Sequence, residues 1–304
     1  MKDAFRRLLL QEDLNFLLTN RVPRIALTRF MGWFSKIRNP LVCRASIAIW
    51  RLFTDLDLSD ARESRFASLH DCFTRELRPG ARPADADPDV LASPCDAIVG
   101  ACGEAAGTEV FQAKGFPYRM EDLFGPTHDA TPYRDGSYVT LRLTSAMYHR
   151  FHAPHDCEVE HVTYHSGDAW NVNPIALARV RRLFCRNERA VLRTRLARGA
   201  HPVAIVPVAA ILVASMRFRF LDVLLHLRYR GPNEIPVSAR FAKGEEMGWF
   251  QHGSTIIVFA PRGFRLHDGI VPGARLRAGQ ALMRLPGRAD AVSREADDLA
   301  CAGA

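Results

Sequence analysis

From residue 93 onward, short stretches rich in apolar and β-branched side chains recur between Gly and Pro turns, and this pattern constrains the fold more than any other feature. The stretches lie at residues 97–99, 138–143, 158–163, 190–192, 203–206, 210–215 and 255–259. Short alternating runs with β-branched content are typical of strands. We therefore expect an α+β chain whose body is mainly β, a barrel or a sandwich, and not a series of βαβ units.

The region before this body is different in composition. Residues 23–53 combine apolar and aromatic side chains with Arg and Lys, which predicts an amphipathic helical segment interrupted at Asn39-Pro40. Residues 54–92 are polar and rich in turns, so a boundary is expected there. We divide the chain into a basic helical region, residues 1–60, and a second domain, residues 61–304, that contains the β body.

The positive charge is concentrated in this leader. The whole chain has 41 basic and 33 acidic residues, a net charge of +8, but residues 1–53 alone hold ten basic and three acidic residues, a net +7. A basic leader on a nearly neutral body favours an anionic membrane surface over nucleic acid. The alternative is a helix that packs on the protein's own core with a solvated basic face.

Two further features concern the compartment. The longest uncharged apolar run, residues 203–216, contains Pro207 and is shorter than the ~20 residues that a spanning helix needs, so no transmembrane helix is expected. The seven cysteines are scattered without a CxxC pair, which favours a reducing compartment. Together these features predict a peripheral protein on the cytoplasmic side of the cell membrane.

Histidines cluster in the middle of the chain, where His149, His152 and His155 are spaced three apart. Imidazole is a common zinc ligand, but Pro154 opposes one helix that would present all three, and no Cys or Glu pattern accompanies them. We expect acid/base catalysis by one or two of these histidines, a structural role for others, and no metal.

A second segment, KGEEMGWFQHGST at residues 243–255, leads directly into an apolar strand. Taken alone, Gly-Ser-Thr before a strand is usually a turn. At a Gly-Ser peptide, however, a serine hydroxyl is able to attack the preceding carbonyl, which glycine leaves sterically open.

Read together, these segments and several others resemble the pyruvoyl-dependent phosphatidylserine decarboxylases. The matching segments, in chain order, are FTRELRPGARP at 73–83, SPCDA at 93–97, KGFPY at 114–118, YHRFH at 148–152, NVNPIAL at 171–177, NERAV at 187–191, KGEEMG at 243–248 and GST at 253–255. One departure is His252, at a position where the better-known bacterial members have an apolar residue.

The resemblance implies a mechanism and a site. The chain would cleave itself between Gly253 and Ser254 into a large and a small chain, and Ser254 would become a covalent pyruvoyl cofactor. Asp96, His152 and Ser254 would form the cleavage triad, and His149 would donate a proton during turnover.

The resemblance also implies a phospholipid substrate, phosphatidylserine or a related amino-lipid. An anionic membrane is expected as a partner from the charge of residues 1–53, and a homodimer is a further possible assembly. Two functions of other classes stay open from the sequence: a non-catalytic membrane-surface protein with the same β body, and a zinc hydrolase that uses the three histidines.

Overall fold

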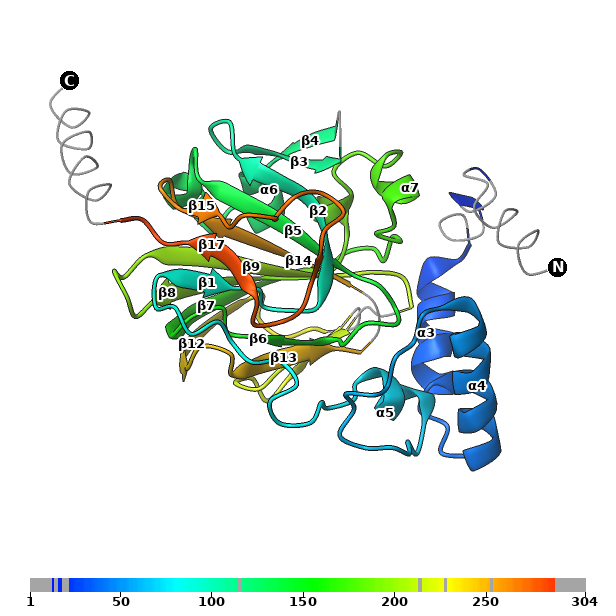
Figure 1. Ribbon diagram of the computed structural model, residues 1–304. Coiled ribbons are helices and arrows are strands. Elements are labelled where there is room, and N and C mark those ends of the chain that lie inside the picture. Colours follow the sequence, from blue (N-terminus) through cyan, green and yellow to red (C-terminus); the bar gives the residue numbers. More distant parts are fainter. Residues whose placement is uncertain are drawn as a thin grey trace, which may run out of the picture.

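Two antiparallel β-sheets form the body of the molecule in this computed structural model (Figure 1), which describes residues 13, 16–17, 22–113, 116–212, 215–226, 229–251 and 254–287. The larger sheet has the order β12-β7-β8-β9-β14-β5-β2-β16. Its strands are β12 (Glu234–Phe241), β7 (Cys157–His165), β8 (Arg189–Leu196), β9 (Pro202–Ala209), β14 (Ser254–Ala260), β5 (Ser137–Leu143), β2 (Ala97–Glu104) and β16 (Arg275–Leu276).

A four-stranded sheet of order β11-β10-β13-β6 packs on one face of the larger sheet. It consists of β11 (Leu224–His226), β10 (Ser215–Phe218), β13 (Glu246–Phe250) and β6 (Arg150–His152). Two small sheets complete the body: β1 (Val90–Ala92), β17 (Ala281–Arg284) and β15 (Arg265–Leu266) in one, and the hairpin of β3 (Glu109–Ala113) and β4 (Phe116–Arg119).

Apolar side chains fill both faces of the larger sheet. Between the two sheets, Phe151 and Phe250 of the smaller sheet share one core with Ile256 and Val258 of β14. The opposite face packs under the short helices α6 (Met120–Phe124), α7 (Pro174–Leu177) and α8 (Leu183–Arg186), near the 3-10 turn η1 (Thr131–Tyr133). Because β14 is covered on both faces, all its residues are buried, and its sequence is continuously apolar after the first two residues.

These features confirm the predicted α+β class with a mainly β body of the sandwich kind. The larger sheet ends in the edge strands β12 and β16, so its described strands do not close into a barrel.

One predicted strand is wrong. The stretch 210–215 is not one strand: β9 ends at Ala209, Leu212 lies in a turn with φ of 71°, and Ser215 already belongs to β10, while residues 213 and 214 lie outside the described residues. The chain leaves one sheet for the other here, which local alternation does not reveal.

The predicted N-terminal helices are present as α3 (Arg24–Phe34) and α4 (Pro40–Phe53). The predicted break at Asn39-Pro40 is confirmed, because α4 begins there as a separate helix. The Asn39 side chain caps it by accepting hydrogen bonds from the amides of Leu41 and Val42, and Pro40 is the first helical residue. The helices lie at one end of the β body, followed by α5 (Leu69–Phe73) (Figure 1). No helix in the described part of the chain is long and apolar enough to cross a bilayer.

Specific contacts join α3 to the body. The Arg24 guanidinium pairs with both carboxylate oxygens of Asp168, at 3.1 and 2.6 Å, and lies 3.8 Å from the Trp170 ring centroid. The Thr28 hydroxyl accepts a 3.0 Å hydrogen bond from the Leu212 amide. Part of this helix is therefore docked on the body. The proposed division at residue 60 stays a prediction.

Candidate active site

Ser254 is the first residue of β14, in the middle of the larger sheet. It pairs with Leu143 of β5 on one side and with Ala209 of β9 on the other. Both partners belong to the core between the sheets, and directly paired residues of antiparallel strands share a face, so the Ser254 side chain faces the sandwich interior.

The environment of the Ser254 hydroxyl is unusual. The residue is fully buried, and its Oγ has no hydrogen-bond partner among the described residues. A buried hydroxyl without a partner costs about 1–3 kcal/mol, so an atom of this kind calls for a functional explanation. The preceding residues His252 and Gly253, which include the predicted cleavage residue Gly253, lie outside the described residues, as do Lys114 and Gly115 of the KGFPY motif.

The connection between the two sheets brings His149 toward this strand end. β13 ends at Phe250, four residues before Ser254, and the Phe250 amide donates a 3.0 Å hydrogen bond to the His149 carbonyl. His149 also follows Leu143, the β5 partner of Ser254, by six residues. Its imidazole is buried, 3.9 Å from the Phe73 ring centroid, and its Nδ1 donates to the Met147 carbonyl at 2.8 Å.

His152 lies further along the same pair of strands, opposite Glu246 of β13. Its Nδ1 is 2.9 Å from the Gly244 carbonyl, and its Nε2 is 3.1 Å from the Tyr148 hydroxyl. Because a carbonyl only accepts, Nδ1 carries the hydrogen and Nε2 accepts from Tyr148. Burial lowers the pKa of His152, so the ring is neutral at pH 7 and Nε2 is a basic nitrogen.

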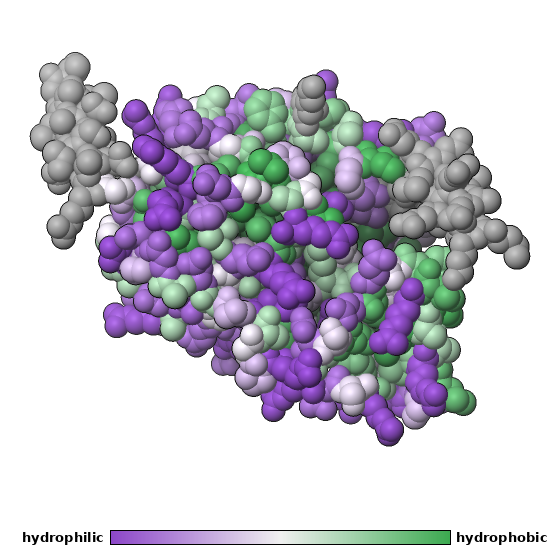
Figure 2. Space-filling view, viewed as in Figure 1, coloured by the Kyte–Doolittle hydropathy of each residue, from purple (hydrophilic) through white to green (hydrophobic). Residues whose placement is uncertain are grey.

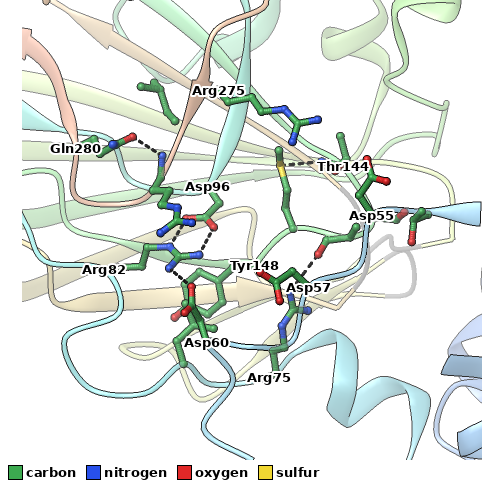
Figure 3. Close-up of a pocket in the computed structure, with 17 residues that line it drawn as sticks. Asp55, Asp57, Asp60, Arg75, Arg82, Asp96, Thr144, Tyr148, Arg275 and Gln280 are labelled. Carbon is green, nitrogen blue, oxygen red and sulfur yellow. Dashed lines mark hydrogen bonds and ion pairs between the residues drawn. The ribbon is translucent and has the colours of Figure 1, made fainter. Parts of the chain in front are cut away.

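Asp96 is held by an arginine. The Arg82 guanidinium donates to both carboxylate oxygens of Asp96, at 2.8 and 2.7 Å, and to Asp60 at 3.0 Å (Figure 3). The Ala278 amide also donates to Asp96, at 2.9 Å. This bidentate pair is the strong, geometrically specific kind of ion pair. Arg82 belongs to the FTRELRPGARP motif, but its contact with Asp96 was not predicted from the sequence.

Two cavities meet at this group. One of about 540 Å³ is lined by Asp96, Arg82 and Tyr148 (Figure 3), and one of about 440 Å³ is lined by His152, Arg82 and Tyr148. The structure thus gathers Asp96 and His152 around Arg82 and Tyr148. Among the described residues, no hydrogen bond joins Asp96 to His152 or either of them to Ser254, so the triad stays a prediction.

The remaining residues of the histidine segment have structural contacts. Arg150 is buried and donates to the Thr74 carbonyl and the Glu246 carboxylate, which braces β6 against α5 and β13. His155 is buried, with Nε2 2.9 Å from the Pro88 carbonyl. No group of three or more His, Cys, Asp or Glu side chains in the described ranges is arranged to hold a metal ion.

Two buried residues near the site were not predicted as functional. Tyr148 contacts His152 directly and lies within the YHRFH motif, which was the available signal. Glu188 is fully buried, and neither carboxylate oxygen has a hydrogen-bond partner in the described chain. The NERAV motif contains Glu188, but nothing in that motif indicates burial.

Comparison with known proteins identifies relatives of this chain. A family model described as phosphatidylserine decarboxylase matches residues 69–284. The phosphatidylserine decarboxylase proenzyme of Halorhodospira halophila is 40% identical over 250 residues, covering 78% of this chain and 81% of that protein. The proenzymes of Erwinia tasmaniensis and Shewanella loihica are each 32% identical, covering 87% and 90% of this chain and 92% and 99% of those proteins. The chain therefore belongs to the phosphatidylserine decarboxylase family.

Proposed function

We propose that this chain decarboxylates phosphatidylserine to phosphatidylethanolamine through a pyruvoyl group that it makes from Ser254 by cleaving its own 253–254 peptide bond. Family membership and the proenzyme names of its relatives support this function. The observation that carries it is Ser254 itself, a fully buried serine at the start of a central strand whose Oγ has no partner among the described residues. Within the described part of the chain this hydroxyl makes no stabilising hydrogen bond, which fits the precursor of the pyruvoyl group.

The cleavage step requires a base, because a serine hydroxyl is a weak nucleophile until its proton is removed. We propose His152 for this role, with Nε2 as the accepting nitrogen. The Gly244 carbonyl fixes the tautomer by accepting from Nδ1, and the negative charge of Asp96 raises the proton affinity of the ring. The proposed triad of Asp96, His152 and Ser254 thus combines a nucleophile, a base and a carboxylate that acts by its charge.

For turnover, a pyruvoyl carbonyl made from Ser254 would supply an electron sink for the electron pair left when carbon dioxide departs, which is the chemistry that a carbonyl cofactor contributes. The chain's own contribution is to exclude water and to move a proton. The β14 end is buried between two sheets, and the buried His149 lies where the two sheets connect. We propose that His149 donates the proton that completes the reaction, because an imidazole is able to act as a general acid.

We further propose that α3 and α4 hold the protein peripherally on an anionic membrane, at the cytoplasmic face. Large apolar side chains are exposed on both helices, as the hydrophobic surface at that end in Figure 2 shows: Ile25, Phe30, Trp33, Leu41, Ile49, Leu52 and Phe53. Exposed cations accompany them, including Arg29, Lys36 and Arg44. Apolar insertion and attraction to anionic headgroups are additive in such helices.

The docking of α3 relates this surface to the site. Thr28 bonds to Leu212, three residues after the Ser254 partner Ala209, so the helix is fixed near the Ser254 end of the sheet. On α4, Trp50 stacks on Phe73, and the Phe73 ring in turn contacts the His149 ring in a tilted arrangement. This placement suits a substrate whose headgroup is presented at a membrane surface. The expected homodimer stays a prediction.

The self-cleavage proposal predicts two products. Denaturing mass spectrometry of the purified 34.0 kDa chain should show residues 1–253 and residues 254–304, the latter blocked to Edman sequencing by its terminal ketone. The same sample should release carbon dioxide from phosphatidylserine vesicles. A single uncleaved chain that decarboxylates the lipid at full rate contradicts the mechanism. If the cleaved protein is inactive on phosphatidylserine but active on another amino-lipid, only the proposed substrate is wrong and the proposed self-cleavage stands.

The membrane proposal predicts a charge-dependent interaction. Trp33→Glu and Phe53→Glu each place a charge on a side chain that is 64% exposed, and each should weaken sedimentation with anionic vesicles about tenfold or more, the effect of losing about 1.5–3 kcal/mol of apolar burial. Raising salt from about 0.1 to 1 M should release part of the wild-type protein, since the Debye length falls from about 10 to 3 Å. Val271→Glu, at a 57% exposed body position, is the matched control and should bind normally. Unchanged binding of both helix variants would make the helices purely structural.

A further inference from the structure

Glu188 is a buried acid for which the proposed mechanism has no role. It immediately precedes β8, is 0% exposed, and has no hydrogen-bond partner for either carboxylate oxygen among the described residues. A buried carboxyl without partners is costly, and such groups concentrate at functional sites. Its position in the sheet relates it to Ser254.

The strand register places Glu188 and Ser254 in one row across the larger sheet. Ser254 pairs with Ala209, and the Ala209 amide donates a 2.8 Å hydrogen bond to the Glu188 carbonyl, continuing the pairing of β8 with β9. Two strand spacings separate the Cα atoms of Glu188 and Ser254, about 10 Å. In this row of paired strands, Ala209 is the residue between them.

Both side chains face the same way. Side chains two residues apart on a strand share a face, and Ala190 and Ile256, two residues after Glu188 and Ser254, both belong to the core between the sheets. Arg189 faces the other side, where it donates to the Leu123 carbonyl. The Glu188 carboxyl and the Ser254 hydroxyl are therefore two buried polar groups without partners on one face, flanking one alanine methyl.

The surroundings keep the carboxyl neutral. Burial raises the pKa of Glu188 to about 8. Tyr164 lies beside it, but the Tyr164 hydroxyl donates to the His226 carbonyl at 2.9 Å. The Glu188 amide donates a 2.9 Å hydrogen bond to the Asp168 carbonyl, and the Asp168 carboxylate is paired with Arg24. Tyr164 of β7 is the ionisable side chain that interacts with the Glu188 carboxyl, whereas His165 of β7 and Arg189 of β8 face the opposite side of the sheet, against the Phe124 and Leu123 carbonyls.

We propose that Glu188 is the general acid of the self-cleavage reaction. Its protonated carboxyl, separated from Ser254 by Ala209, gives its proton to the nitrogen of Ser254 as the 253–254 peptide bond breaks. This inference rests on the proposed function. It gives the NERAV motif a role in the reaction: the histidine base accepts the proton of the attacking hydroxyl, and Glu188 donates a proton to the leaving nitrogen.

The proton balance of the step is complete with these two groups. The Ser254 Oγ forms a bond to the Gly253 carbonyl carbon, and the hydroxyl proton goes to the histidine. The bond from that carbon to the Ser254 nitrogen then breaks, and the nitrogen takes up the proton from Glu188 and becomes an amine. The carboxylate left on Glu188 recovers a proton from the imidazolium, so no external reactant is consumed.

Glu188→Gln tests this role, because an amide reproduces the size and neutrality of the protonated carboxyl but has no acidic proton. Starting from freshly synthesised chain, cleavage of the variant at pH 7 should be about 100-fold slower than cleavage of the wild type, within the range for loss of a general acid. Wild-type cleavage should slow above about pH 8 as Glu188 ionises, and the variant should lack this decline. Glu188→Asp, which keeps the acid on a shorter side chain, should cleave at an intermediate rate.

The controls separate the possible outcomes. Thr140→Val removes another buried hydroxyl without a partner in the described chain, on the opposite face of the same sheet, and should cleave at the wild-type rate. A folded Glu188→Gln chain that cleaves at the wild-type rate with the wild-type pH profile overturns the inference. If Gln prevents folding, a Glu188→Asp chain that cleaves at the wild-type rate at every pH overturns it equally. A wild-type chain that never cleaves contradicts the proposed function instead.

Discussion

Replacement of Ser254 by alanine is expected to leave the chain as one 34.0 kDa polypeptide without decarboxylase activity. The substitution removes the only atom proposed to attack the 253–254 bond and the only source of the ketone, so the loss should be complete at the detection limit of both assays. Folding should be retained, because Ser254 Oγ has no hydrogen bond among the described residues, and the removed hydroxyl was a cost to stability. Intact mass, carbon dioxide release and thermal unfolding measure the three effects.

A serine at the other end of the same strand pair provides the control for this experiment. Ser137 on β5 is also buried and pairs with Ala260 at the far end of β14, but its hydroxyl donates to the Phe264 carbonyl. Ser137→Ala should therefore cost about 1 kcal/mol of stability and leave cleavage and activity intact. Cleavage of Ser254→Ala at the normal position would remove this serine from the mechanism.

The two histidines should separate maturation from turnover. His152→Ala should accumulate uncleaved chain, with cleavage slowed about 100-fold or more, because it removes the proposed base. His149→Ala should still cleave appreciably but decarboxylate poorly, because the proposed proton donor is missing after the cofactor has formed. Chain cleavage on gels and carbon dioxide release from the cleaved fraction measure the two steps independently.

The structure places the two histidines at different positions relative to Ser254. His149 lies at the end of β13 that leads to Ser254, whereas His152 is opposite Glu246, further from that end. Uncleaved His149→Ala together with cleaved His152→Ala would exchange the two roles. His267→Ala serves as the control, since this histidine lies in a loop and contacts the Asp268 carbonyl. Normal cleavage and turnover in both test variants would exclude both histidines.

Arg82 has a consequence for how the cleavage site is assembled. Its guanidinium holds both oxygens of Asp96, while His152 is bonded to Gly244 and Tyr148. In the proposed triad, Asp96 would therefore act on His152 through charge, and the Gly244 carbonyl would supply the orienting contact. The KGEEMG motif thus contributes a backbone atom to the site, as well as preceding the cleavage position.

The sequence by itself determined six strands of the larger sheet, the helices α3 and α4, and the chemical classes of the candidate site residues, whereas strands such as β6, β12 and β13 were not predicted. These features are local: alternation with period two is encoded along one strand, the Asn39-Pro40 start along one helix, and the motifs within a few residues. The strands from Ser137 to Leu143 and from Ser254 to Ala260 could therefore be predicted, whereas residues 210–215 could not, because the end of β9 depends on where the chain crosses between sheets.

Only the tertiary structure decided which of these residues meet. The pairing of Arg82 with Asp96, the contact of Tyr148 with His152, and the row that joins Glu188, Ala209 and Ser254 depend on packing and on the register between strands. A shift of one residue in register would turn Glu188 away from the face that Ser254 occupies. Sequence alternation shows which residues of one strand share a face. The relative register of β8, β9 and β14, however, is fixed by the shared core. The sequence alone therefore does not show that Glu188 and Ser254 lie in one row on one face of the sheet.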